Sequence, residues 1–377
     1  MKEGWTYKKL GDVCNINSGK SIKSSLIHSE RKEGFSPCYG GNGLRGYVEM
    51  PNCNGGNPII GRVGAQCGNV HYCDSPFYAT EHALIVTLLD KTINPLWLCH
   101  LFSSMDLKQY AEGAAQPVIA ARKLLSLNVS IPPMSVQQRI VERLDAAFEN
   151  IDKLKANAEK QLAEAQTLFQ KSLAKAMEPK EGWEEKTLGQ LGDLKNGMNF
   201  AHNEKGVDLH ILGVGDFGNR FSIDDVRELQ MISLNQQPSE DYLLKDGDIV
   251  FVRSNGNKQL VGRSLVVYPG DNSTTFSGFC IRFRKSLKVL DERFLVYLLK
   301  SDNTRKKLFG NGANISNLNQ KTLQSLIVPL PPLAEQQRIV ERLDALSENI
   351  RKYEEIQRQI ISECDALKQA LLRKVFE

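Results

Sequence analysis

Three groups of residues in this 377-residue chain have types that could bind a nucleotide or a metal ion. The first, Gly19-Lys20-Ser21, has the ending of a phosphate-binding P-loop, but Cys14 stands where that loop needs its first glycine. The second, from Gly213 to Gly218, has the spacing of a dinucleotide-binding loop, but the residues after it do not predict an amphipathic helix. Both nucleotide sites are therefore disfavoured.

The cysteines are the third candidate, because they could supply metal ligands. His71 stands two residues before Cys73, and Cys53 and Cys67 could complete a zinc site. However, there is no C-x-x-C pair and the spacing is irregular, so we expect reduced thiols in a cytosolic protein. A zinc-dependent module remains an alternative, and no metal ligand is predicted.

Signatures of common enzymes are also missing from the sequence. The amino-methyltransferase signature is Asn or Asp followed by Pro-Pro and an aromatic residue, but the two Pro-Pro pairs here follow Ile131 and Leu330. No His-Glu-x-x-His metalloprotease motif occurs. We therefore predict no catalytic residues and expect the chain to be non-catalytic on its own.

Composition excludes several classes of protein. Hydrophobic residues make up 41% and charged residues 24%, with a formal net charge of +4, so the chain is neither disordered nor collagen-like. No run approaches the ~18 apolar residues of a membrane span, and the polar beginning is not a signal peptide. These features predict a cytoplasmic protein with no membrane partner.

The dominant feature is an internal duplication. Gln137–Ala146 returns without change as Gln336–Ala345, and Glu3-Gly-Trp5 at the beginning returns as Glu181-Gly-Trp183. The two repeats have different spacings, 199 and 178 residues, so the second half carries about 21 additional residues between them. A duplication of this length is not a solenoid, whose repeats are much shorter.

Each half combines a glycine-rich region of short β-like runs with one long helix that has a heptad pattern. We therefore predict an α+β fold with an internal pseudo-two-fold repeat, in which two globular domains are joined by two long antiparallel helices that form an intramolecular coiled coil. The predicted boundaries are residues 1–131 and 179–330 for the domains and 132–178 and 331–377 for the helices. Alternatively, each helix packs only on its own domain.

The heptad seam of the coiled coil is predicted from apolar and small residues. In the first helix it comprises Ile140, Leu144, Ala147, Ile151, Leu154, Ala158, Ala165 and Leu168. In the second helix it comprises Ile339, Leu343, Leu346, Ile350, Tyr353, Gln357, Cys364 and Leu367.

The duplicated Pro-Pro-x-x-x-Gln-Gln-Arg-Ile-Val helix start, the repeated Gly-Trp-x-x-x-x-Leu-Gly opening and the two long helices resemble the specificity (S) subunit of type I restriction–modification enzymes. The resemblance covers essentially the whole chain. It implies two target-recognition domains, each binding one half of a split double-stranded DNA target, with the helices setting the gap. Because the two domains differ in sequence, the implied target is asymmetric.

The resemblance also implies partners. Two methyltransferase (M) subunits would carry S-adenosylmethionine, and restriction (R) subunits would use ATP and Mg, so no cofactor is expected in this chain. The sequence leaves two other functions open. One is the S subunit of a related system with a fused nuclease–methylase chain, and the other is a coiled-coil scaffold that joins two protein-binding domains.

Candidate DNA-binding residues are basic and amide side chains in the glycine-rich loops, because these residue types bind phosphates and base edges. Each half has a strand that ends in arginine before a polar turn, which gives Arg62, Gln66 and Asn69 in the first half and Arg253, Asn255, Lys258, Gln259 and Arg263 in the second. Earlier loops add Lys20, Lys23, Asn42, Arg45, Asn199 and Lys205. Segments before the long helices add Gln116, Arg122, Asn314, Asn317 and Lys321. Ordinary surface turns are the alternative for all of these positions.

Candidate partner-docking residues come from the identical helix starts. A helix seam does not require outward-facing residues to be the same in both copies, whereas two copies of one partner protein do. We therefore predict equivalent docking sites at Gln137, Gln138, Arg139, Glu142 and Arg143, and at Gln336, Gln337, Arg338, Glu341 and Arg342.

Overall fold

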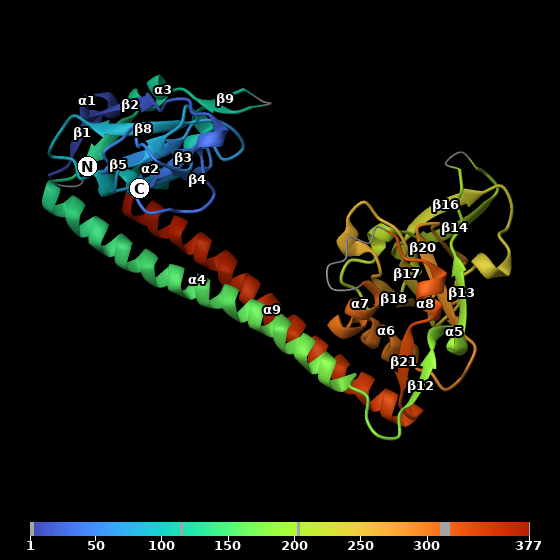
Figure 1. The fold of residues 1–377 in the computed structure, drawn as a ribbon. Helices are drawn as coiled ribbons and strands as arrows, with labels where there is room; N and C mark the ends of the chain where they lie inside the picture. The colour runs from blue at the N-terminus through green and yellow to red at the C-terminus, as the bar shows by residue number, and fades with distance from the viewer. Residues whose placement is uncertain (1–3, 114–115, 202–203, 310–316, 377) are drawn as a thin grey trace. The chain divides into compact units, whose positions relative to one another are not determined.

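The computed structural model describes residues 4–113, 116–201, 204–309 and 317–376 (Figure 1). It divides into two compact units, each of which contains a globular domain and parts of both long helices. The first unit comprises Met1–Glu159 with Arg358–Glu377, and the second comprises Lys160–Gln357.

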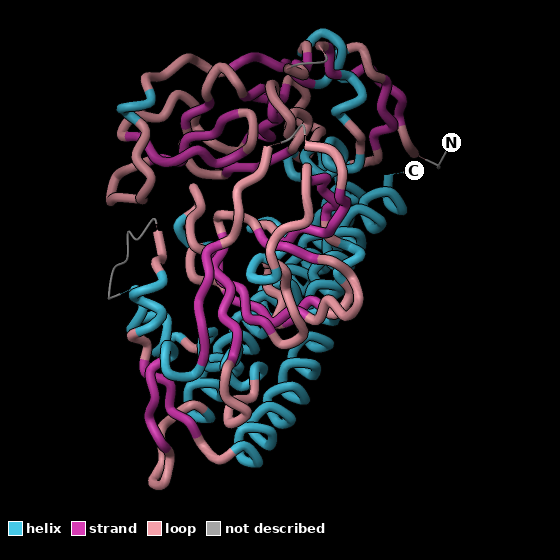
Figure 2. The backbone as a smooth tube through the Cα atoms, turned by 90° about the vertical axis from the view of Figure 1, so that its right-hand side faces the viewer, coloured by secondary structure: helices cyan, strands magenta, loops and turns pink. Residues whose placement is uncertain are grey.

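The globular domain of the first unit is built from short strands (Figure 2). The strands are β1 (Thr6–Lys9), β2 (Cys14–Ser18), β3 (Ser36–Gly40), β4 (Gly43–Val48), β5 (Asn57–Gly61), β6 (Val70–Cys73), β7 (Tyr78–Ala79), β8 (Ala83–Leu88), β9 (Ala111–Glu112), β10 (Val118–Ile119) and β11 (Asn128–Ile131). They form an antiparallel sheet in the order β2-β8-β5-β6, a second sheet in the order β4-β3-β7, and the pairs β1-β11 and β10-β9. The helices are α1 (Leu10–Val13), α2 (Pro95–Ser104) and α3 (Ala121–Leu125).

The globular domain of the second unit repeats this topology. Its strands are β12 (Glu184–Thr187), β13 (Gly192–Asn196), β14 (Val207–Leu212), β15 (Ser222–Ile223), β16 (Gln230–Leu234), β17 (Asp248–Val252), β18 (Ser264–Val267), β19 (Thr274–Phe276), β20 (Cys280–Lys285) and β21 (Ile327–Leu330). The sheets run β13-β20-β17-β18-β15 and β16-β14-β19, and β12 pairs with β21. The helices are α5 (Leu188–Leu191), α6 (Glu292–Lys300), α7 (Asp302–Phe309) and α8 (Gln320–Gln324).

Sequence insertions explain where the two domains differ. In the first unit β3 and β4 are joined by a two-residue turn, whereas β14 and β16 in the second unit are separated by a segment that contains the extra edge strand β15. Much of the additional length of the second half is therefore accommodated at this connection, and the central strands correspond one to one.

The first helix after the main sheet begins at an equivalent capped position in both domains. The Asn94 side chain accepts hydrogen bonds from the N–H groups of Leu96 and Trp97, and Pro95 occupies the first turn of α2. The Asp291 side chain accepts from Phe294 N–H at the start of α6. Both helices pack their apolar faces into the core of their domain.

The predicted long helices are confirmed as α4 (Met134–Ala176) and α9 (Leu333–Phe376). In the first unit the Lys155 ammonium lies 2.7 Å from Asp365 and the Lys368 ammonium lies 2.5 Å from Asp152, which is an antiparallel register. In the second unit the Tyr353 hydroxyl donates to Gln161 Oε1 at 2.8 Å. Within each unit the two helices therefore pair, and they also pack on the domain.

The predicted seam of α4 is right at one position of each heptad, whereas at the other position Ile140 and Ala147 are partly buried and the two later leucines are wrong. Ile151, Ala158 and Ala165 are buried as expected, but Leu154 and Leu168 are about half exposed. The second seam position lies one residue later, so that Lys155 packs there and its ammonium reaches Asp365 at the edge. A long lysine stem covers apolar surface while its charge stays in water, which is why hydrophobicity alone misplaced the seam.

Candidate nucleic-acid interface

Arg62 and Arg253, the two arginines predicted from the strand ends, occupy equivalent places in the two domains. Arg62 follows β5, donates its main-chain N–H to His82 O at 2.8 Å, and accepts from Ile119 N–H at 2.9 Å. Arg253 follows β17, donates to Phe279 O at 2.8 Å, and accepts from Leu318 N–H at 2.7 Å. Each arginine backbone is thus fixed between the start of a central strand and the segment that leads to the long helix.

The side chains of these arginines are also held alike. Arg62 Nη1 donates to Glu81 O at 3.3 Å, and Arg253 Nη1 donates to Gly278 O at 3.5 Å. Each acceptor immediately precedes the residue that receives the main-chain N–H. Because a guanidinium has five N–H donors, this single bond orients the half-buried group and leaves capacity for an external acceptor.

Glycines at the end of the opening repeat allow the early loops to approach these sites. Gly19 N–H donates to Ala83 O and Gly197 N–H donates to Cys280 O, both at 3.0 Å. A Cβ atom at Gly19 would lie 2.2 Å from Ala79 O, and one at Gly197 would lie 2.1 Å from Ser277 O. Only glycine fits at either position, which gives the sequence repeat a structural reason.

In the first domain, three predicted residues line one depression of about 500 Å³, which also contains Val63, the residue directly after Arg62. Asn42, Arg45 and Gln116 line it, with Val63 and His82. Arg45 Nη2 donates to Ser24 Oγ at 3.0 Å. This bond holds the loop that contains exposed Lys23 beside Arg45, on the side of the domain where the depression lies. The structure therefore groups most of the first-half candidates.

In the second domain, the corresponding group surrounds Gly278 and Phe279. Ser254 forms a β-bridge with Asn317, directly after Arg253. Asn199 packs on Gly278, since a Cβ at that glycine would lie 2.1 Å from Asn199 Oδ1. Asn255 and Gln259 lie in the turn beyond Arg253, where Asn255 Oδ1 accepts from Asn257 N–H.

Other candidates lie outside these two groups or use their polar atoms internally. Asn69 Nδ2 donates to Gln66 Oε1 at 3.1 Å within their turn. Lys205, shortly before β14, donates its main-chain N–H to the side chain of Asn235, directly after β16. Three further candidates have exposed side chains elsewhere on the domains: Lys20, Arg122 and Lys321. Asn314 and the side chain of Lys258 lie outside the described residues.

A group of cations that the sequence did not predict lies in the second domain near Arg263. Lys300 lies at the end of α6, with its ammonium 4.6 Å from the centroid of the Phe221 ring. Burial, together with the positive charges of Arg263 and Arg305, lowers the pKa of Lys300 to about 8. Arg263 Nη1 donates to Gly218 O. No spacing in the sequence links these residues, because they come from three separate elements.

The comparisons with known proteins agree with this geometry. Residues 2–164 and 180–361 match the family model of the type I restriction modification DNA specificity domain. The chain belongs to this family. The matched ranges include both recognition domains and the first part of each long helix.

Relatives of this specificity protein include the EcoKI specificity subunit of Escherichia coli, which is 26% identical over 100% of this chain and 89% of its own length. A putative specificity subunit of Haemophilus influenzae is 27% identical over 90% of this chain and 86% of its own. The EcoprrI specificity subunit of Escherichia coli is 40% identical, but over only 37% of this chain and 34% of its own length.

Solved structures share the fold of the specificity protein. A chain from work on complex assembly and conformational transition of the type I R-M system has a TM-score of 0.77 at 18% identity, with 100% of this chain and 98% of that one covered. The HsdS subunit from Thermoanaerobacter tengcongensis has a TM-score of 0.57 at 18% identity, with 100% and 97% covered.

The helix starts of the specificity protein require one correction. Gln137 and Gln336 were predicted to face outward, but both are 0% exposed. Gln137 Oε1 accepts from Asn94 N–H at 2.7 Å, and its Nε2 donates to Thr92 O and Pro132 O. Gln336 makes the same three bonds, to Asp291 N–H, Val289 O and Pro331 O. Each amide thus ties its helix to its own domain.

The remaining docking candidates are exposed in both copies. They are Gln138, Arg139, Glu142 and Arg143 on α4, and Gln337, Arg338, Glu341 and Arg342 on α9. Contacts with the adjoining domain explain other identical positions: Asp145 bonds His100, and Asp344 bonds Arg293 and Tyr297. Packing therefore accounts for part of the repeat and leaves two equivalent exposed sets.

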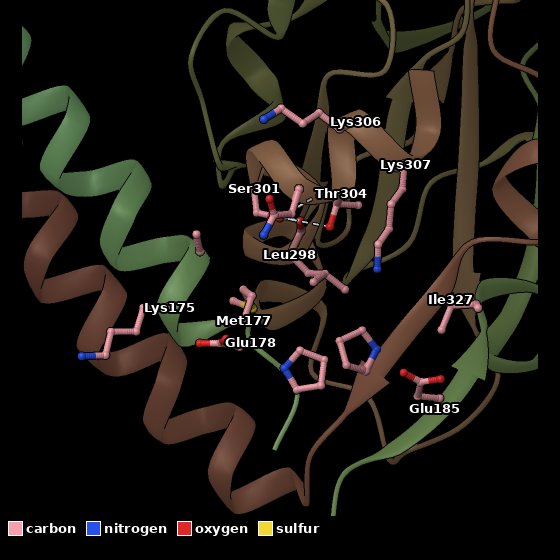
Figure 3. A pocket seen from close by; sticks show the side chains of 14 residues that line it. Lys175, Met177, Glu178, Glu185, Leu298, Ser301, Thr304, Lys306, Lys307 and Ile327 are labelled. Carbon is pink, nitrogen blue, oxygen red and sulfur yellow. Dashed lines mark hydrogen bonds between the residues drawn. The ribbon is translucent and has the colours of Figure 1, made fainter. Parts of the chain in front are cut away.

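A second hollow of the specificity protein, of about 480 Å³, lies at the end of α4 in the second unit (Figure 3). Lys306 and Lys307 of α7 and the carboxylates of Glu178 and Glu185 line it. No predicted site residue lies there, and its mixed charges favour neither an anion nor a cation.

The described residues contain no metal site and no membrane-spanning helix. In the described part of the chain no three His, Cys, Asp or Glu side chains are grouped to hold a metal ion, and the eight cysteines are free. No helix of the described residues is long and apolar enough to cross a membrane.

Proposed function

We propose that this chain is the DNA sequence-recognition subunit of a type I restriction–modification complex and acts in the cytoplasm. Each recognition domain binds one half of a split double-stranded DNA target. The observation that carries this proposal is the equivalent placement of Arg62 and Arg253, both held by main-chain and side-chain hydrogen bonds at the same point of the two domains. Arginine is the residue that most often recognises guanine edges.

The two half-sites differ because the neighbours of the arginines differ. Asn42, Arg45 and Gln116 lie in the first domain beside the Arg62 segment, whereas Asn199 and Asn317 flank Arg253. Different donor and acceptor sets select different base edges, so the target is asymmetric.

The catalytic chemistry belongs to the partners. The exposed sets around Arg139 and Arg338 bind two M subunits, which supply adenine methylation with S-adenosylmethionine, and R subunits add ATP- and Mg-dependent translocation and cleavage. The identity of these exposed residues in both helix starts supports two equivalent docking sites.

The test is a genome-wide map of adenine methylation in cells that express this chain with its candidate M subunit. We expect a new split motif, with two unlike short halves around a fixed gap. As a control, the purified complex is titrated with duplex DNA at several salt concentrations. A coiled-coil scaffold would show no salt-dependent DNA binding and no new motif, and that result would overturn the proposal.

A further inference from the structure

We propose that the residue directly before β8 and β20, His82 in the first domain and Phe279 in the second, determines one base preference in each half-site. This inference rests on the proposed function. It assigns a role to two residues that differ between the domains although their main chains make the same contacts.

The backbone geometry places both residues against the arginines. His82 O and Phe279 O receive the N–H of Arg62 and Arg253 at 2.8 Å in both domains. The residues before them, Glu81 and Gly278, accept the guanidinium hydrogen bonds. A DNA edge that is bound by the arginine therefore lies within reach of the side chain at position 82 or 279.

Both side chains face outward from a fixed backbone. The His82 side chain is 46% exposed and lines the depression with Asn42, Arg45 and Gln116. Phe279 is 59% exposed, while its N–H donates to Ser277 Oγ at 3.3 Å. The phenyl ring is thus largely exposed at the surface, instead of packing into the core.

The chemistry of the two rings differs in a way that bases distinguish. An imidazole N–H can donate to the N7 acceptor of a purine, and the His82 ring lies in a polar setting, with Glu81 Oε1 3.5 Å from its Nε2. A phenyl ring makes no such bond, but it contacts the methyl group of thymine. His82 therefore favours a purine in its half-site, and Phe279 favours thymine in the other.

The experiment exchanges the two side chains in the complex with the M subunit. His82→Phe should change one position of one half-site from a purine to thymine, and Phe279→His should make the converse change in the other half. The gap and the other half should stay the same. Met50→Phe and Met231→His are matched controls, because these methionines are 79% and 58% exposed on the same two domains, and the motif should not change.

Each outcome separates this inference from the proposed function. If wild type gives no split motif, the proposed function is wrong. If wild type gives one and both exchange variants methylate it unchanged, only the inference is wrong. If an exchange variant methylates nothing, the purified complex is titrated with duplexes that carry each base at each position of one half. We expect preference at one position to shift or fall about ten- to hundredfold, and equal preferences to wild type would overturn the inference.

Discussion

Arg62 and Arg253 donate their main-chain N–H groups to equivalent carbonyl oxygens at the same distance, 2.8 Å, in two domains whose loops differ in sequence. Their side chains repeat this agreement, since each guanidinium bonds the carbonyl one residue upstream. A duplicated scaffold thus presents the same group twice, and the surrounding loops are free to differ. This arrangement allows one fold to recognise two unlike sequences.

Replacing either arginine should affect only one half-site. In Arg62→Ala we expect relaxed base preference in one half and a loss of about 1–3 kcal/mol in DNA binding, because a bidentate base contact disappears. Arg253→Ala should affect the other half, so each variant is the control for the other. Binding to duplexes mutated in one half at a time measures this. Equal loss for both halves in each variant would mean that the arginines hold phosphates instead.

Removing a buried glutamine should destabilise one unit strongly. Gln137→Ala leaves Asn94 N–H and the carbonyls of Thr92 and Pro132 without their buried partner, which costs about 2–4 kcal/mol. Gln336→Ala should do the same in the second unit. Thermal unfolding of the purified protein measures the loss. The exposed neighbours provide controls, since Gln138→Ala and Gln337→Ala should have almost no effect; a similar loss in these controls would contradict the structural role.

Charge reversal on the helix starts should change the stoichiometry of the complex. Arg139→Glu or Arg338→Glu should each leave one M subunit bound, and the double variant none, because each reversal replaces an exposed cation by an anion at one proposed docking site. Native mass spectrometry of the assembled complex counts the subunits. Lys171→Glu, on an exposed position of α4, is the control. Two bound M subunits in the double variant would place docking elsewhere.

Much of the fold followed from the sequence because its signals are local or repeated. The Pro-Pro pairs, the heptads and the ten identical residues locate the long helices, and an arginine after an apolar run marks the strand ends at Arg62 and Arg253. Gln137 was misplaced because an outward polar residue and one that satisfies buried backbone groups look alike in a sequence. Only the contacts of its amide distinguish the two.

The rest of the site depends on contacts between distant residues. His82 meets Arg62 across the β5–β8 pairing, and Phe279 meets Arg253 across β17–β20. Lys300, Arg263 and Arg305 come together only when α6, α7 and the turn before β18 have packed. Strand register and helix packing set these neighbours, and neither can be obtained from residue types along the chain.

The half-buried Lys300 gives the stability of the second unit a definite pH dependence. Burial and the neighbouring arginines lower its pKa to about 8, whereas an unfolded lysine has a pKa of about 10.4. Below pH 8 both states are charged and the cost of the buried charge is fully present. As pH rises from 8 to 10.4 the folded state loses its proton first, so this cost falls.

Lys300→Met should therefore stabilise the protein on the order of 2 kcal/mol at pH 7 and by less at pH 9.5. Urea unfolding of the variant and the wild type at both pH values measures the difference. Lys288→Met changes an exposed lysine and should have the same small effect at both. A larger gain at high pH would contradict the assigned cause.

Lengthening both long helices together should widen the gap between the half-sites. Because α4 and α9 pair in an antiparallel register, seven residues inserted after Glu159 and seven after Gln357 preserve the heptads on both sides. Seven helical residues add about 10 Å, close to the length of three base pairs. The methylated motif should keep both halves and gain about three base pairs of gap. The same insertion near Pro179, beyond the end of α4 at Ala176, adds no paired helix and should leave the gap unchanged. A changed half-site with the original gap would show that the helices do not set the spacing.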